Sequence, residues 1–268
     1  MLINGSPGDA IAAIDRGLQY GDGLFETISC VAGRPRWLAL HFDRLKRGIE
    51  RLGLPFGDFA LLEREVSALA NGQERCFIKL TLTRGPATRR GYAPTGDEVP
   101  TRIVSRHEWV HSVEPASGFR LGLSDIALGS NPALAGLKHL NRLEQVMAQR
   151  HLVAGDFDEV LMKAATGEPI SGSMSNVFIV DPPFLVTPAL HACGVDGVMR
   201  RLVLEHAGSC DLSVQVRPVT GLEVAAAREL FVTNVRLGVQ PVTWYQGRKF
   251  ATFERAGRLQ SAIDATWR

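Results

Sequence analysis

The stretch Gly-Leu-Lys-His-Leu-Asn-Arg-Leu-Glu-Gln, residues 136–145, is the most informative part of this chain. Its second half predicts the start of a helix, because Asn141 is a good N-cap residue and Glu144, three positions later, completes a capping-box pattern. The apolar residues that follow keep to one helical face as far as Gly155, which is expected to end the helix. Lys138 therefore stands at a rigid helix entrance, among small and apolar neighbours.

Lys138 is a candidate nucleophile. Partial desolvation favours the neutral amine of a lysine, and a neutral amine can form a Schiff base with a carbonyl compound. On this stretch alone, a solvated surface lysine in front of a helix is the more common case. Other segments of the chain must decide between the two interpretations.

The composition is that of an ordinary globular protein. Of the 268 residues, 45% are hydrophobic and 22% are charged, so the chain can bury one large core or two modest ones. Basic residues are spread along the chain and the net charge is only +2, which argues against nucleic-acid binding. Four well-separated cysteines form no CxxC pair, so we expect neither a metal site nor disulfides. Neither a signal peptide nor a membrane span is evident, and we expect a cytoplasmic protein.

Hydrophobic spacing predicts two α/β domains. We expect an N-terminal domain over residues 1–112, a linker over 113–120 and a C-terminal domain over 121–268. A 3.6-residue apolar spacing predicts helices over 38–52 and 58–70. Strands are expected at residues 24–31, 76–83, 101–108, 119–123, 159–163, 176–180, 184–186, 213–217 and 229–232.

Three further segments have the residue types of a ligand site. The glycines of residues 21–27 allow a close backbone approach, and Arg44 lies among apolar neighbours, where an arginine needs an anionic partner. Residues 194–200 form a glycine-flanked helix start, where the N–H groups of Val198 and Met199 are candidate phosphate ligands. Each segment also has an ordinary explanation: a tight turn, a structural salt bridge and a helix start that binds nothing.

The order of these segments resembles that of the fold-type IV pyridoxal-phosphate (PLP) enzymes, and the lysine segment is most similar to that of their 4-amino-4-deoxychorismate lyases. The likeness covers nearly the whole chain and is carried by residues 15–27, 41–45, 131–145, 170–178 and 194–200. It implies the mixed α/β (α+β) two-domain fold of the D-amino-acid aminotransferase-like proteins. It also implies PLP as the cofactor.

The resemblance implies a role for each matched position. Lys138 would hold PLP and act as a general base, and Thr27 would face the substrate, where its hydroxyl donates a proton or positions the leaving group. Arg44 would bind the cofactor phosphate. The other cofactor-binding positions that the resemblance implies are Ser171, Ser175, Asn176, Val198, Met199, Thr233 and Asn234.

Ser171 is the clearest departure from the family pattern. Relatives usually have a glutamate there, whose carboxylate keeps the pyridine nitrogen of PLP protonated and strengthens the ring as an electron sink. Ser171 can only form a hydrogen bond. An engineered change, a natural variant with a weaker demand on the sink and a misplaced alignment all stay open. Moving Glu168 into this position would need a three-residue register shift, which would turn its side chain to the other strand face.

The function that the resemblance implies is a lyase that releases pyruvate from 4-amino-4-deoxychorismate and leaves 4-aminobenzoate, a step of folate biosynthesis. Aromatisation supplies much of the driving force, so a weaker electron sink is tolerable. A fold-type IV aminotransferase for D-amino acids or branched-chain substrates is the nearest alternative, and Ser171 counts against it. A non-catalytic PLP-binding relative is the third possibility.

The remaining expectations concern the substrate and the assembly. A substrate with two carboxylates needs cations or other donors, and the candidates are Arg84, Arg89, Arg90, Tyr92 and Asn141. Basic residues on a long loop are more often simply solvated. Relatives of this fold are homodimers, so we expect a homodimer, with the loop over residues 84–96 as a candidate for closing the partner's site.

Overall fold

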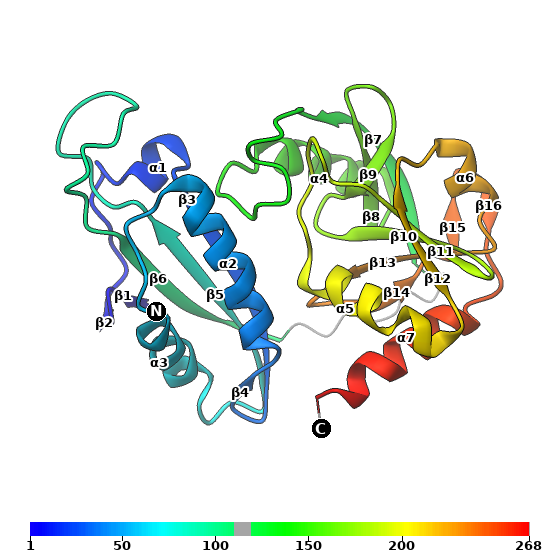
Figure 1. The fold of residues 1–268 in the computed structure, drawn as a ribbon, viewed down its shortest axis with the longest axis horizontal. Helices are drawn as coiled ribbons and strands as arrows, with labels where there is room; N and C mark the ends of the chain where they lie inside the picture. Colours follow the sequence, from blue (N-terminus) through cyan, green and yellow to red (C-terminus); the bar gives the residue numbers. More distant parts are fainter. Residues whose placement is uncertain (110–118, 268) are drawn as a thin grey trace. The chain divides into compact units, whose positions relative to one another are not determined.

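The computed structural model describes residues 1–109 and 119–267 of the chain, which fall into two compact units (Figure 1). Unit 1 contains Met1–His111 and Leu137–Asn141, and unit 2 contains Ser112–Gly136 and Arg142–Arg268. Most of the predicted linker, residues 113–118, lies outside the described residues.

The lysine segment Leu137–Asn141 belongs to unit 1, whereas the sequence predicted one continuous C-terminal domain from residue 121. Its backbone pairs with the first residues of a strand of unit 1. The N–H of Phe25 donates to the carbonyl of Lys138 over 2.9 Å, and the N–H of Leu140 donates to the carbonyl of Gly23 over 3.0 Å. Such pairing joins residues far apart in the sequence, so local patterns do not predict it.

Unit 1 is an antiparallel sheet of six strands in the order β2-β1-β6-β5-β3-β4 (Figure 1). Its strands are β1 (Leu2–Ile3), β2 (Ser6–Pro7), β3 (Gly23–Val31), β4 (Arg34–Pro35), β5 (Arg75–Thr83) and β6 (Thr101–Glu108). Its helices are α1 (Arg16–Tyr20), α2 (Leu38–Leu52) and α3 (Phe59–Ala70). The predicted strands over 24–31, 76–83 and 101–108 are confirmed to within one residue.

The helices α2 and α3 pack on one face of this sheet. Side chains alternate between the two faces of a strand, so Ile28 on β3 and Leu80 on β5 point toward the helices and are fully buried. Phe25, Thr27 and Lys79 alternate with them and belong to the other face. The two faces of the strand therefore carry different kinds of side chain.

Both predicted helices of unit 1 are confirmed, together with the residues that end or begin them. Helix α2 ends where Gly53 takes a left-handed conformation with φ of 59°, which glycine adopts without a steric penalty. Helix α3 begins after Asp58, whose side chain accepts a hydrogen bond from the N–H of Leu61 over 2.9 Å.

Unit 2 contains two five-stranded sheets, in the orders β12-β11-β10-β13-β14 and β16-β15-β7-β8-β9. The strands are β7 (Arg120–Leu128), β8 (Glu159–Ala164), β9 (Pro169–Gly172), β10 (Asn176–Asp181), β11 (Phe184–Pro188), β12 (Ser213–Arg217), β13 (Glu229–Asn234), β14 (Gly238–Pro241), β15 (Trp244–Tyr245) and β16 (Arg248–Lys249). The helices are α4 (Leu143–Gly155), α5 (Val198–His206), α6 (Gly221–Ala226) and α7 (Glu254–Ala265), with a 3-10 turn at Ala207–Cys210. The predicted strand over 119–123 continues to Leu128, past a register irregularity in its pairing with β8.

The predicted capping box of α4 is wrong. The helix begins at Leu143, and its N-cap residue is Arg142, without a side-chain cap. The amide of Asn141 donates instead to the carbonyl of Gly21 over 3.3 Å, within unit 1. Glu144 accepts from a backbone N–H outside the helix over 2.9 Å. Both side chains of the motif are therefore used by tertiary hydrogen bonds.

No helix within the described ranges is long and apolar enough to cross a membrane.

The four cysteines are buried as free thiols. Two of them, Cys30 and Cys76, lie directly opposite each other on β3 and β5, and burial raises the pKa of the Cys30 thiol to about 12. A neutral thiol of this kind is a packing residue and not a nucleophile.

Two helix-interior glycines give a matched test of this packing. A methyl group on Gly48 of α2 would come within 2.7 Å of the buried side chain of Leu24, whereas one on Gly257 of α7 meets nothing within 4 Å. We expect Gly48→Ala to lower the free energy of unfolding by about 1–3 kcal/mol, the usual cost of overpacking. Gly257→Ala should raise it by about 0.5–1 kcal/mol, because alanine favours the helix. Urea denaturation measures both, and equal effects of the two changes would contradict this account.

Candidate active site

Lys138 is positioned by strand β3. The two backbone hydrogen bonds between its segment and the strand fix its place on the edge of the sheet. Its amine lies 4.2 Å from the centre of the Phe25 ring. Thr27, two residues further along β3, shares the sheet face of Phe25. The structure thus brings the two predicted catalytic residues to the same face of unit 1.

The opposite face of β3 carries a buried cluster of charges. Glu26 accepts hydrogen bonds from both Arg44 and His41 of α2, at 2.8 Å from the Nε of Arg44 and 2.6 Å from the Nδ1 of His41. All three side chains are at most 7% exposed. The sequence predicted that Arg44 needs an anion and missed Glu26. Strand alternation could have identified Glu26, because its carboxylate is on the same face of β3 as the buried Leu24 and Ile28.

This cluster fixes the ionisation of its members. Burial alone would raise the pKa of Glu26, but Arg44 and His41 lower it to about 2. Burial lowers the pKa of His41, and the charges of Arg44 and Lys138 lower it further, against the opposing effect of Glu26. His41 is therefore neutral, with Nδ1–H donating to Glu26, and its Nε2 finds no hydrogen-bond partner among the described residues.

Arg44 is thus tied to Glu26 within unit 1. The ordinary alternative for this residue, a structural salt bridge, is present in the structure. The assignment of Arg44 to the cofactor phosphate stays a prediction.

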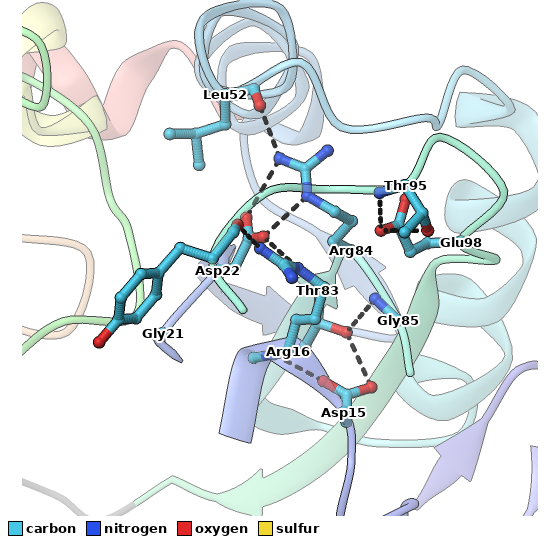
Figure 2. Close-up of polar contacts among 12 residues, drawn as sticks. Asp15, Arg16, Gly21, Asp22, Leu52, Thr83, Arg84, Gly85, Thr95 and Glu98 are labelled. Carbon is cyan, nitrogen blue, oxygen red and sulfur yellow. Dashed lines mark hydrogen bonds and ion pairs between the residues drawn. The ribbon is translucent and has the colours of Figure 1, made fainter. Parts of the chain in front are cut away.

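Arg84 is a structural residue and not a free cation for a substrate. Figure 2 shows its guanidinium against Asp22, with distances of 2.7 and 3.2 Å to the carboxylate oxygens. It also donates to the carbonyl of Leu52, the last residue of α2, and to that of the C-cap residue Gly53, over 2.7 Å each. Asp22 accepts a further hydrogen bond from Arg16. The expectation that Arg84 is available to a substrate carboxylate is therefore wrong.

The tip of the loop that follows Arg84 is exposed. Arg16 anchors the loop by donating to the carbonyl of Tyr92 over 2.5 Å, and the ring of Tyr92 meets that of Tyr20 edge-on at 5.3 Å. Tyr92 itself is 83% exposed, and Arg89 is also exposed. The roles of Arg89, Tyr92 and Asn141 in substrate binding remain predictions.

In unit 2, the predicted cofactor residues of the segment 171–176 are buried and hydrogen-bonded. The hydroxyl of Ser171, at the end of β9, donates to the carbonyl of Gly172 over 2.9 Å. The amide of Asn176 donates to the carbonyl of Val195 over 2.9 Å, and thereby joins β10 to the loop in front of α5.

Glu159 organises this segment and was missed by the sequence analysis. Its carboxylate accepts from the backbone N–H groups of Val160, Ser173 and Met174, and from the hydroxyls of Ser173 and Ser175. Glu159 is only 2% exposed. Because five donors use all the acceptor positions of the carboxylate, Glu159 has none left with which to replace the glutamate missing at Ser171.

The start of α5 has the features of an anion site. Its N-cap residue is Gly197, so no side chain caps the helix, and the N–H groups of Val198 and Met199 have no partner among the described residues. The side chain of Asn176 packs against Gly197 so closely that a Cβ there would come within 2.2 Å of its oxygen. A glycine cradle with free N–H groups at a helix N-terminus fits a phosphate group.

Thr233 and Asn234, at the end of β13, use their side chains within unit 2. The hydroxyl of Thr233 donates to the carbonyl of Gly238 over 2.6 Å. The side-chain oxygen of Asn234 accepts from the N–H groups of Arg236 and Leu237. Their assignment to the phosphate stays a prediction, as do those of Ser175 and Asn176.

Comparison with known proteins gives a consistent set of matches. The family model of class IV aminotransferases matches residues 23–245. The chain is 36% identical over 244 residues to an aminodeoxychorismate lyase of Vibrio harveyi, which covers 90% of this chain and 89% of the relative. It superposes on the 4-amino-4-deoxychorismate lyase of Pseudomonas aeruginosa with a TM-score of 0.92 at 37% identity, over 98% of both chains. A hypothetical aminotransferase from Mycobacterium tuberculosis, solved in its PLP-bound form, shares the fold at 20% identity and a TM-score of 0.84, over 96% of this chain and 93% of that chain.

The buried cluster makes a pH-dependent prediction. Because the pKa of Glu26 is lowered in the folded state, its stabilising contribution is complete above about pH 4.5 and is lost as the pH falls towards 2. Replacing Glu26 by Gln leaves Arg44 buried without its anion, and should cost about 3 kcal/mol at pH 6. The cost should shrink at pH 3, because the wild-type protein has by then lost part of the same contribution.

Guanidinium denaturation at the two pH values measures this difference, and Glu63→Gln, at an exposed site on α3, is the matched control. A Glu26→Gln protein as stable as the wild type at pH 6, or with the same deficit at both pH values, would contradict the account.

Proposed function

The chain belongs to the class IV aminotransferase family, and we propose that it is a PLP-dependent lyase that converts 4-amino-4-deoxychorismate to 4-aminobenzoate and pyruvate. The observation that carries the proposal is that Lys138 lies against the Phe25 ring and that Thr27 is on the same face of the unit 1 sheet as Phe25. The near full-length likeness to two aminodeoxychorismate lyases supports it.

When bound, PLP supplies an aldehyde, to which the Lys138 amine can bond, and a pyridine ring, which withdraws electrons from the reacting carbon. Val198 and Met199 fit its phosphate, because their N–H groups are free at the start of α5. Ser171 is the residue assigned to the ring nitrogen, and its hydroxyl offers a hydrogen bond without a negative charge.

Proton transfer is the task of Lys138 and Thr27. The neutral Lys138 amine takes the proton from C4 of the substrate as a general base. The bond between C3 and the ether oxygen breaks, and the Thr27 hydroxyl donates a proton toward, or positions, the departing enolpyruvyl group. That group becomes pyruvate, and the ring that remains is aromatic. Where Thr27 gives up a proton, the proton that Lys138 has taken from C4 replaces it, so that neither residue is changed at the end of the reaction.

Ser171 favours the lyase over an aminotransferase. Amino transfer has two half-reactions, and each needs the cofactor to act as a strong electron sink. In the lyase reaction the ring becomes aromatic, and this supplies much of the driving force. The lyase therefore depends less on the cofactor as an electron sink. Glu159 has no free acceptor position with which to restore the missing negative charge. The placement of Lys138 and Thr27 on one face of the unit 1 sheet argues against a non-catalytic PLP-binding relative.

We also propose that the protein is a cytoplasmic homodimer that acts in folate biosynthesis. Four buried free cysteines suit a reducing compartment. Exposed apolar side chains on α4, among them Leu143, Val146 and Met147, offer a surface for a second subunit. Light scattering should give twice the chain mass of 29.2 kDa.

The lyase is tested by mixing the purified protein, with added PLP, with 4-amino-4-deoxychorismate and following the fluorescence of 4-aminobenzoate. We expect product from the wild type and a loss of at least about a thousandfold in Lys138→Ala, which removes both the cofactor link and the base. No product from the wild type, or equal product from Lys138→Ala, would contradict the proposal.

The role of Ser171 gives a separate prediction. Ser171→Glu restores a carboxylate and should raise amino transfer from D-alanine by about tenfold or more, the effect of roughly 1.4 kcal/mol in the barrier. Lyase turnover should change much less. Ser171→Gln has the same size without the charge, and should raise neither rate. Equal rates of amino transfer in the Glu and Gln variants would show that the carboxylate is not what the site lacks.

A further inference from the structure

The residue just before the lysine segment is held by the loop that leads to α5. Gly136 forms a parallel β-bridge with Val195. Its N–H donates to the carbonyl of Gly194 over 3.0 Å, and its carbonyl accepts from the N–H of Asp196 over 3.0 Å. Both polar backbone groups of Gly136 are therefore bonded to one loop, and all these residues belong to unit 2.

This loop leads into the candidate phosphate site. Asp196 immediately precedes Gly197, the N-cap residue of α5. The amide of Asn176 donates to the carbonyl of Val195 over 2.9 Å, so β10 also supports the loop. Gly136 is thus joined by hydrogen bonds to the stretch of backbone that ends at the first N–H groups of the helix.

Lys138 follows Gly136 after a single residue. That residue, Leu137, is only 4% exposed. The backbone of Lys138 is held in turn by the hydrogen bond from the N–H of Phe25. Because two residues of extended chain span at most about 7 Å, Lys138 stays close to the loop in front of α5 for as long as the bridge at Gly136 holds.

Gly136 has a backbone conformation that most other residues avoid. Its φ is 81°, in the left-handed region, where an L side chain is strained. A Cβ at this position would meet the side chain of Asp196 at 3.8 Å and nothing closer, so there is room for a methyl group. The backbone angle, and not the space around it, is therefore what calls for glycine here.

We propose that Gly136 is a positioning residue, which keeps Lys138 within reach of a cofactor whose phosphate is bound at the start of α5. The inference rests on the proposed function, in which Lys138 carries PLP, and it assigns the residue that couples the two attachment points. The phosphate and the aldehyde of PLP are joined by a rigid ring. The groups that hold them must therefore be set to match, and the bridge at Gly136 sets them.

Equilibrium dialysis of the full-length protein against PLP tests this role. Gly136→Ala should raise the dissociation constant of PLP by about five- to thirtyfold, because the loaded protein has to keep a backbone angle that alanine disfavours, whereas the free protein can relax. Gly136→Asn should lose less affinity, since asparagine tolerates the left-handed region better than alanine.

Gly247→Ala is the matched control. Gly247 lies in the turn between β15 and β16, with φ of 83° and nothing within 4 Å of an added Cβ. The same conformational cost at this place should leave the dissociation constant of PLP within about twofold of the wild-type value. A loss as large as that of Gly136→Ala would overturn the proposal, because backbone strain anywhere in unit 2 would then have the same effect.

The dependence on Lys138 separates positioning from simple support of the loop. In a Lys138→Ala protein, PLP is held without the lysine, so adding Gly136→Ala should change its dissociation constant by no more than about twofold. An equal loss with and without Lys138 would overturn the proposal, because Gly136 would then serve the phosphate loop alone.

Unchanged PLP binding by Gly136→Ala in the protein that retains Lys138 would overturn the proposal too. Failure of the proposed function appears elsewhere, as an absence of 4-aminobenzoate in the wild-type turnover assay, and is thus distinguishable.

Discussion

Two backbone hydrogen bonds between the lysine segment and the start of β3 are the constraint on which the rest of the account depends. They fasten residues more than a hundred positions apart in the sequence, and they place the Lys138 amine over the ring of Phe25. Backbone pairing of this kind does not depend on flexible side chains. The backbone of Lys138, the candidate nucleophile, is consequently held by the sheet, and the side chains of β3 contribute to the surroundings of its amine.

The alternation of β3 separates two kinds of chemistry. Glu26 faces α2 and forms a buried ion pair with Arg44, which ties the strand to the helix. Phe25 and Thr27 face the other way, on the side where the Lys138 amine lies. A one-residue slip of the strand would exchange the two faces and bury Phe25 and Thr27. The buried cluster therefore fixes the register on which the candidate site depends.

The sequence predicted what local patterns encode. Apolar spacing placed α2 and strand alternation placed β5, because each pattern lies within one element. Local patterns did not predict the partners of buried charges, because the donors to Glu159 come from residues that only the fold brings together. The prediction that Asn141 caps α4 was wrong for the same reason. Its side chain donates a tertiary hydrogen bond to the carbonyl of Gly21 and does not cap the helix.

The most direct test of the central claim asks which lysine carries the cofactor. Borohydride treatment of the PLP-loaded protein fixes the cofactor to the lysine that holds it, and peptide mass mapping then locates the label. The account predicts the label on the peptide that contains Lys138 and none on the peptide that contains Lys79, although both amines lie near the same ring. A label on Lys79, or no label on Lys138, would contradict it.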